Sequence, residues 1–131
     1  MRASAGTQRE LVAMLDRFRT LVADKDFAIL SEFGQDADVR IIGSEANESA
    51  EGPRQLEDFF KRIFARPSRY SWQWAKPSFS CSGDVAWLLA DGEVIIRDDG
   101  GERRRPYRIT GVLEKRDGKW LWLQFHGSEP A

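Results

Sequence analysis

The segment from Tyr70 to Ser128 most constrains the fold, because it alternates long runs of strand-forming residues with short turn signals. Over 70–74 aromatic and polar residues alternate, which is the period of a half-buried strand. Pro77 indicates a bulge or an edge strand, because proline cannot donate to a sheet ladder. We predict four long strands joined by turns at 82–84, 98–102 and 117–118, with the later strands over 85–96, about 104–115 and 120–128. Asp117-Gly118 is the strongest hairpin signal.

The first half of the chain has helical periodicity. Thr7 and Glu10 fit a capping box, and the apolar residues Leu11, Leu15, Phe18 and Val22 that follow share one helix face. A shorter helix is expected after 24–26, a strand over 37–43, a polar loop over 43–52 and a third helix from Pro53 to near Pro67. Three helices followed by a meander of antiparallel strands make an α+β domain that spans residues 1–131.

Composition narrows the function classes. The net charge of −1 gives no general attraction to nucleic acid or to an anionic membrane. The basic run 103–105 adjoins acidic residues, which favours a solvated strand start. One histidine and one distant cysteine make no metal cluster, and no cofactor motif is present. The single Cys81, the lack of an apolar leader and the lack of a membrane-length run predict a cytoplasmic protein.

Three stretches resemble a known family. These are Gly83-Asp84-Val85-Ala86-Trp87, Tyr107–Val112, and Arg116–Trp120 with His126-x-Ser128-x-Pro130. Together with the element order, they resemble SnoaL-like domains of the NTF2-like superfamily, close to the association domain of calcium/calmodulin-dependent kinases. The resemblance implies a cone in which a sheet curls around a helix, an apolar cavity, and a homodimer paired through the sheet face. Because that superfamily includes isomerases, dehydratases, cyclases, transport factors and assembly hubs, the fold alone does not choose a function.

The resemblance also allows two kinds of site to be tested. A steroid-type isomerase needs a carboxylate base and a tyrosine donor. The corresponding positions hold Ile41 and Phe18, which can neither accept nor donate a proton. The arginines that line the cavity of kinase association domains correspond to Gly111 and Gly127. An isomerase of that type and an anion-binding hub pocket are therefore both disfavoured.

The other positions that the resemblance assigns to the cavity are mostly apolar. They predict a pocket for a small hydrophobic ligand, without a cofactor. The expected pocket residues are Phe18, Ile41, Phe60, Trp74, Trp87, Ile109 and Phe125. One alternative is an isomerase, cyclase or hydrolase acting on a small hydrophobic substrate, with His126, Asp38 or Arg108 as its acid–base group. The other is a dimerisation or assembly module without a ligand.

His126 depends on the register of the closing hairpin. A two-residue turn places His126 on the face of Ile109, whereas a three-residue loop with a bulge places it opposite Arg108. We favour the second register, because it separates an apolar face from a mixed face. The expected interface residues on the mixed face are Arg108, Thr110, Trp120, Trp122, Gln124 and His126.

Overall fold

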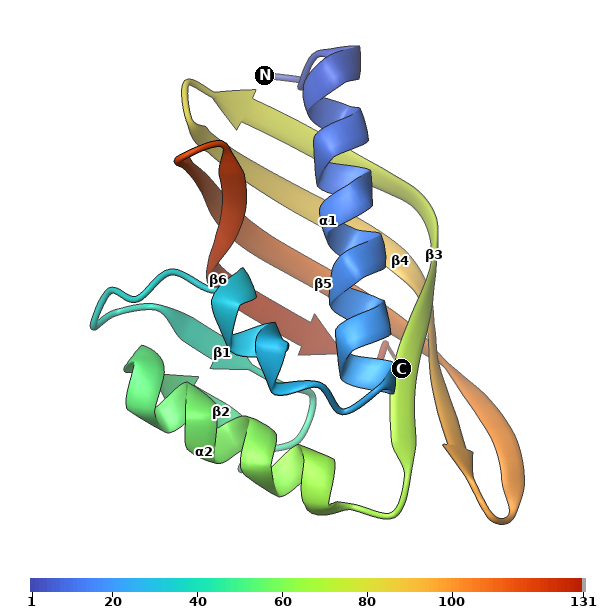
Figure 1. The fold of residues 1–131 in the computed structure, drawn as a ribbon. Helices are drawn as coiled ribbons and strands as arrows, with labels where there is room; N and C mark the ends of the chain where they lie inside the picture. The colour runs from blue at the N-terminus through green and yellow to red at the C-terminus, as the bar shows by residue number, and fades with distance from the viewer. Residues whose placement is uncertain (131) are drawn as a thin grey trace.

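The computed structural model describes residues 1–130. Its helical elements are α1 (Ala5–Ala23), the 3-10 helix η1 (Phe27–Glu32) and α2 (Gly52–Ala65). Its strands are β1 (Arg40–Ile42), β2 (Ser49–Glu51), β3 (Arg69–Ser82), β4 (Val85–Asp98), β5 (Gly101–Arg116) and β6 (Lys119–Ser128). They form one six-stranded sheet in the order β2-β1-β6-β5-β4-β3. Figure 1 shows α1 lying across the concave face of this curved sheet, with α2 beside β1 and β2.

The predicted α+β class, with helices packed on a curved sheet, is confirmed with two refinements. First, β1 pairs with β6 in parallel, so the sheet is mixed rather than purely antiparallel. Second, the expected middle helix is a single 3-10 segment of six residues, whose first turn is capped by the Asp26 side chain. The other two expected helices are α1 and α2, and α1 is capped by Ser4 rather than Thr7.

The segment predicted as a polar loop over 43–52 contains the short strand β2. It folds back on β1 in antiparallel register, and the backbone N–H of Gly43 donates to the Glu48 carbonyl at 2.6 Å. The α2 helix then begins at once, with Pro53 in its first turn as predicted. This tight return holds residues 44–48 above the concave face of the sheet.

The closing hairpin corrects the predicted register. Asp117 and Gly118 form a two-residue turn with φ of 50° and 80°, so the expected three-residue loop is wrong. The bulge lies farther along, where Leu113 pairs with Trp122 and Val112 pairs with Gln124, which leaves Leu123 as the extra residue. An extra residue reverses the alternation of faces along a strand. In β6, the set of alternate residues that points inward before Leu123 therefore points outward after it.

This reversal determines which side chains of β6 are buried and which are exposed. Before the bulge, Trp120 and Trp122 point inward and are buried. After it, Gln124 and His126 point outward and are exposed. Placing the two tryptophans on the exposed face was therefore wrong, whereas the polar pair does lie there.

Candidate functional site

A cavity of about 170 Å³ opens between α1, α2 and the concave face of the sheet. Its floor is aromatic and aliphatic, and it includes Phe18 from α1, Phe60 from α2 and Phe125 from β6. The rings of Phe18 and Phe125 stack with centroids 5.4 Å apart, and Trp72 lies 5.6 Å from Phe18. Helices and sheet each supply part of this floor, so the cavity is a product of the whole fold.

The volume limits the size of an occupant. A cavity of about 150 Å³ lined by aliphatic and aromatic side chains takes up benzene, whereas pockets for drug-sized ligands span roughly 300–1,000 Å³. The cavity of about 170 Å³ lies close to the lower figure. Its enclosed part therefore matches one aromatic ring with a short substituent.

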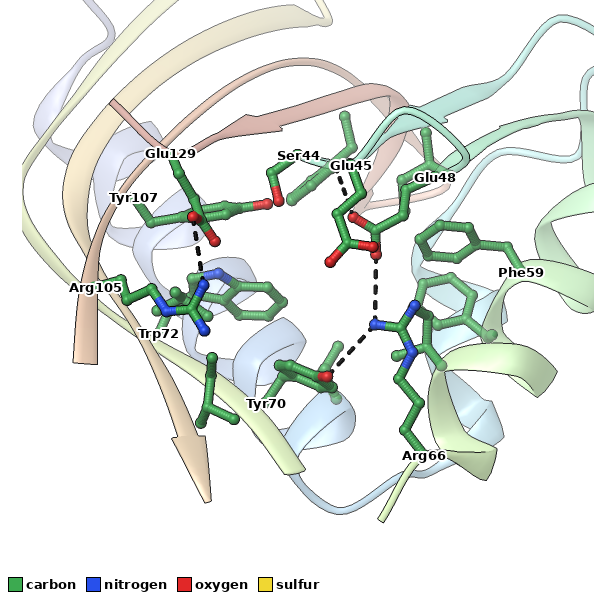
Figure 2. Close-up of a pocket in the computed structure, with 18 of the residues that line it drawn as sticks. Ser44, Glu45, Glu48, Phe59, Arg66, Tyr70, Trp72, Arg105, Tyr107 and Glu129 are labelled. Atoms are coloured by element: carbon green, nitrogen blue, oxygen red, sulfur yellow. Dashed lines mark hydrogen bonds and ion pairs between the residues drawn. The ribbon is translucent and has the colours of Figure 1, made fainter. Parts of the chain in front are cut away.

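The mouth of the cavity is polar, in contrast to the floor (Figure 2). Ser44, Glu45 and Glu48 reach it from the turn between β1 and β2, and they face Arg66 and Tyr70 from the junction of α2 and β3. Arg103, Arg105 and Tyr107 come from β5, and Glu129 follows β6. The mouth thus brings together side chains from distant parts of the chain.

Glu48 is the least exposed carboxylate of this group, with its side chain 14% exposed against 40% for Glu129. Its Oε1 accepts a hydrogen bond from the Glu45 backbone N–H at 3.0 Å. Its Oε2 lies 3.7 Å from Nη1 of Arg66, which is an ion-pair distance longer than a hydrogen bond. Nη1 of Arg66 also donates to the Tyr70 hydroxyl at 3.4 Å. The carboxylate is held by its loop while its charge is only loosely paired.

The opposite side of the mouth has a second loose pair. Nη1 of Arg105 lies 3.7 Å from Oε2 of Glu129. Arg103, one step along the same face of β5, pairs with Asp98 at 3.3 Å. Acidic and basic side chains are therefore matched around the opening, and no excess of either sign faces the cavity from this group.

Tyr107 connects the polar mouth to the apolar floor. Burial raises the pKa of its phenol to about 12, while a hydrogen bond with Ser44 acts in the opposite direction. The ring reaches its position because Gly127 has no side chain, since a Cβ there would lie 2.2 Å from the Tyr107 hydroxyl. The Tyr107 side chain at the cavity is therefore a neutral phenol near neutral pH.

The raised pKa of Tyr107 predicts a loss of stability at high pH. Between its ordinary pKa of 10.0 and the folded value of about 12, the folded state keeps a proton that the unfolded chain releases. The free energy of unfolding should therefore fall across that window by roughly 2–3 kcal/mol from this group. Tyr107→Phe should lose this component, measured by urea unfolding at about pH 9 and about pH 11, between which about half of the decrease, roughly 1.4 kcal/mol, is expected. An equal decrease in both proteins would contradict the placement of Tyr107.

Four of the expected pocket residues line the cavity, namely Phe18, Ile41, Phe60 and Phe125. Three do not. Trp74 stacks on Trp72 beyond the wall, and Ile109 is buried elsewhere in the core. Trp87 lies on the outer face of β4 and is 41% exposed, so its assignment to the pocket is wrong.

None of the three expected acid–base candidates lines the cavity. His126 lies on the outer face, paired in register with Thr110 and Ile42. Arg108 lies on the same face and forms an ion pair with Asp91 at 2.7 Å. Asp38 is exposed in the turn before β1. An acid–base role for these three in the cavity is therefore contradicted by their positions.

Of the expected interface residues, Arg108, Thr110, Gln124 and His126 are exposed on the outer face. Trp120 instead donates from Nε1 to Oε1 of Glu10 at 2.8 Å, which ties the hairpin to α1. Trp122 lies in the core. A Cβ on Gly111 would lie 2.3 Å from its ring, so Trp122 fills the space beside Gly111.

Sequence reasoning missed the polar mouth. Ser44, Glu45 and Glu48 lie in a turn without periodicity, and Glu129 follows the last strand, so no local pattern marks them. One signal was present: Arg103, Arg105 and Tyr107 alternate along β5 and so share the inner face. The predicted solvated strand start at 103–105 does not include this inward placement of Arg103 and Arg105.

Residues 1–130 contain neither a cluster of metal ligands nor a helix suited to span a membrane. No group of three or more metal-ligating side chains gathers there. Within the same range, neither α-helix has the length and apolar character that a membrane span requires.

Comparison with known proteins gives a family match and many similar folds. The family model for the SnoaL-like domain matches residues 11–131. A provisionally named dehydratase of the NTF2-like family from Streptomyces avermitilis has a TM-score of 0.84 at 15% identity, covering 98% of this chain and 99% of its own. An NTF2-like superfamily protein from Salmonella enterica has a TM-score of 0.82 at 20% identity, covering 98% and 94%.

A third similar structure has the name of the kinase association domain, to which the sequence also shows a resemblance. A provisionally named calcium/calmodulin dependent protein kinase II association domain from Xanthomonas campestris has a TM-score of 0.76 at 22% identity. The match covers 98% of this chain and 94% of that one. No curated protein matches the chain. At these identities the similar structures establish the fold alone. An activity has to be argued from the residues of the site.

Proposed function

We propose that this chain, which belongs to the SnoaL-like domain family, binds a small apolar ring compound in the cavity between its helices and its sheet. The supporting observation is the contrast between an aromatic floor and a polar mouth around about 170 Å³ of space. Transfer of an apolar ring from water to such a floor is favourable by about 25 cal/mol for each Å² buried. The cavity size favours a single ring.

A cavity-filling variant tests this proposal. Ile63 lines the cavity from α2 and is only partly buried, so Ile63→Trp can add bulk there without a large clash. Toluene should raise the melting temperature of the wild-type protein and should not raise that of Ile63→Trp, because the ring displaces the ligand.

Val12→Trp is the matched control, since Val12 lies exposed on α1 and outside the cavity wall. This control should respond to toluene as the wild type does. The same rise in melting temperature with Ile63→Trp would show that toluene binds elsewhere and would contradict the proposal.

An enzyme is the second candidate, favoured by Glu48 and Tyr107 lining one cavity. Glu48 would take a proton from a ligand carbon and return it to another ligand atom, while the Tyr107 hydroxyl donates to the oxygen that gains charge. The dehydratase name of one similar structure agrees with acid–base chemistry of this kind. Solvent deuterium entering the methyl group of acetophenone with the wild type, and not with Glu48→Gln, would favour the enzyme over simple binding.

We also propose that two copies pair through the outer face of the sheet. Trp87 and Leu89 are 41% and 44% exposed there, and Val112 is in register with Trp87. The ion pair of Asp91 and Arg108 flanks this patch with one charge of each sign. A copy related by a two-fold axis presents the same residues, so apolar surface and opposite charges can meet their counterparts.

A further inference from the structure

We infer that the cavity selects a ring bearing a neutral hydroxyl group over the same ring bearing a carboxylate or no polar group. This inference rests on the proposed function and adds the chemical class of the ligand. It follows from the chemistry of the mouth, where hydrogen-bond acceptors and donors face one another above the apolar floor (Figure 2).

The acceptors are the carboxylates of Glu45 and Glu48, which come from the turn above the cavity. A carboxylate accepts hydrogen bonds and donates none. Glu48 has one neutral hydrogen bond, from the Glu45 backbone, and its pairing with Arg66 is 3.7 Å long. A ligand O–H at this place would therefore meet a mostly buried carboxylate with spare acceptor capacity.

The donors come from the junction of α2 and β3 and from β5. Arg66 carries five N–H groups, and within residues 1–130 only Nη1 donates a hydrogen bond, to Tyr70 at 3.4 Å. Tyr107 is held as a neutral phenol beside Ser44. A hydroxyl group both donates and accepts, so one ligand oxygen can use a carboxylate and one of these donors together.

The charge balance of the mouth argues against an anion. Each guanidinium that lines the cavity already has a carboxylate within 4 Å, as the pairs of Arg66 with Glu48 and of Arg105 with Glu129 show. A ligand carboxylate would approach Glu45 and Glu48 as a like charge and would lose its own hydration. An unsubstituted ring would leave the polar groups of the mouth without any new partner.

Three probes that share a methyl-substituted benzene ring test this inference, namely toluene, p-cresol and p-toluate, with their affinities measured by titration calorimetry. Hydrogen bonds to charged groups are strong enough that p-cresol should bind about tenfold more tightly than toluene. The carboxylate p-toluate should bind more weakly than toluene. Equal affinities for p-cresol and toluene, or a preference for p-toluate, would overturn the inference while leaving the proposed function intact. Failure of all three probes to bind would instead overturn the proposed function.

Glu48→Gln identifies the residue responsible. Glutamine keeps an oxygen for the Glu45 backbone N–H but removes the charge. The variant should lose most of the p-cresol preference, keep its toluene affinity within about twofold, and bind p-toluate more tightly because Arg66 has lost its counter-charge.

Glu51→Gln is the matched control, because Glu51 lies in β2, pairs with Arg40 and is outside the cavity wall. It should show the wild-type order of the three probes. A Glu48→Gln variant that also keeps the wild-type order would contradict the role assigned to Glu48.

Discussion

Trp122→Ala is expected to lower the free energy of unfolding by about 3–5 kcal/mol, the range found for removal of a large aromatic side chain from a core. Trp122 is fully buried at the Leu123 bulge, and its ring lies 5.5 Å from Phe18 and 5.2 Å from Phe125. Removing it would leave a void, because Gly111 on the neighbouring strand contributes no side chain to fill the space. Equilibrium unfolding in urea measures the loss.

Trp122→Phe is the control for this prediction. It keeps an aromatic ring and removes an indole N–H that has no hydrogen-bond partner among the residues described. Its loss of stability should therefore be much smaller than that of the alanine variant. Neither variant should change the molecular mass in solution, because Trp122 does not reach the outer face. A change in mass without a loss of stability would contradict the core position.

Trp87→Asp is expected to convert a dimer into a monomer at micromolar concentrations. The change places a charge at the centre of the exposed apolar patch beside Leu89 and Val112, where two copies would each have to bury it. Light scattering coupled to size-exclusion chromatography measures the mass. The fold should persist, because Trp87 is exposed on the monomer and makes little contribution to its core.

Val12→Asp is the matched control for the dimer, since Val12 is equally exposed but lies on α1. It should leave the mass unchanged. Wild-type protein that is already monomeric at those concentrations, or a Trp87→Asp variant that stays dimeric, would rule out pairing through this face.

Most of the architecture could be predicted because it follows from local patterns. The apolar spacing of Leu11, Leu15 and Phe18 requires a helix with one buried face, and that face packs on the sheet. Pro77 lies at the register shift between Ala75 and Ser78 on the edge strand β3, as its missing N–H implied.

The register of the last strand could not be predicted because the bulge residue has no distinguishing chemistry. Leu123 is an ordinary strand residue, whereas Asp117 and Gly118 adopt positive φ values typical of the tight turn. A bulge placed in the turn instead of at Leu123 still puts His126 on the outer face, but it wrongly carries Trp120 and Trp122 along with it.

The polar mouth could not be predicted because its parts meet only in three dimensions. Glu48 and Arg66 lie on either side of α2, and Glu129 lies far beyond both in sequence. Their proximity depends on how β1 pairs with β6, a parallel contact between distant segments that no local pattern indicates. The apolar floor was easier to anticipate, since Phe18 and Ile41 occupy positions that the family resemblance assigns to its cavity.

Methyl NMR of the wild-type protein titrated with toluene tests most directly whether the cavity holds a ligand. The methyl groups of Ile41, Ile63 and Ile96 line the cavity, while those of Leu89 and Val112 lie on the outer face and serve as an internal control. Saturable shifts of the first set with an unchanged second set are the predicted result. An unresponsive first set, or shifts confined to Leu89 and Val112, would contradict the proposed function.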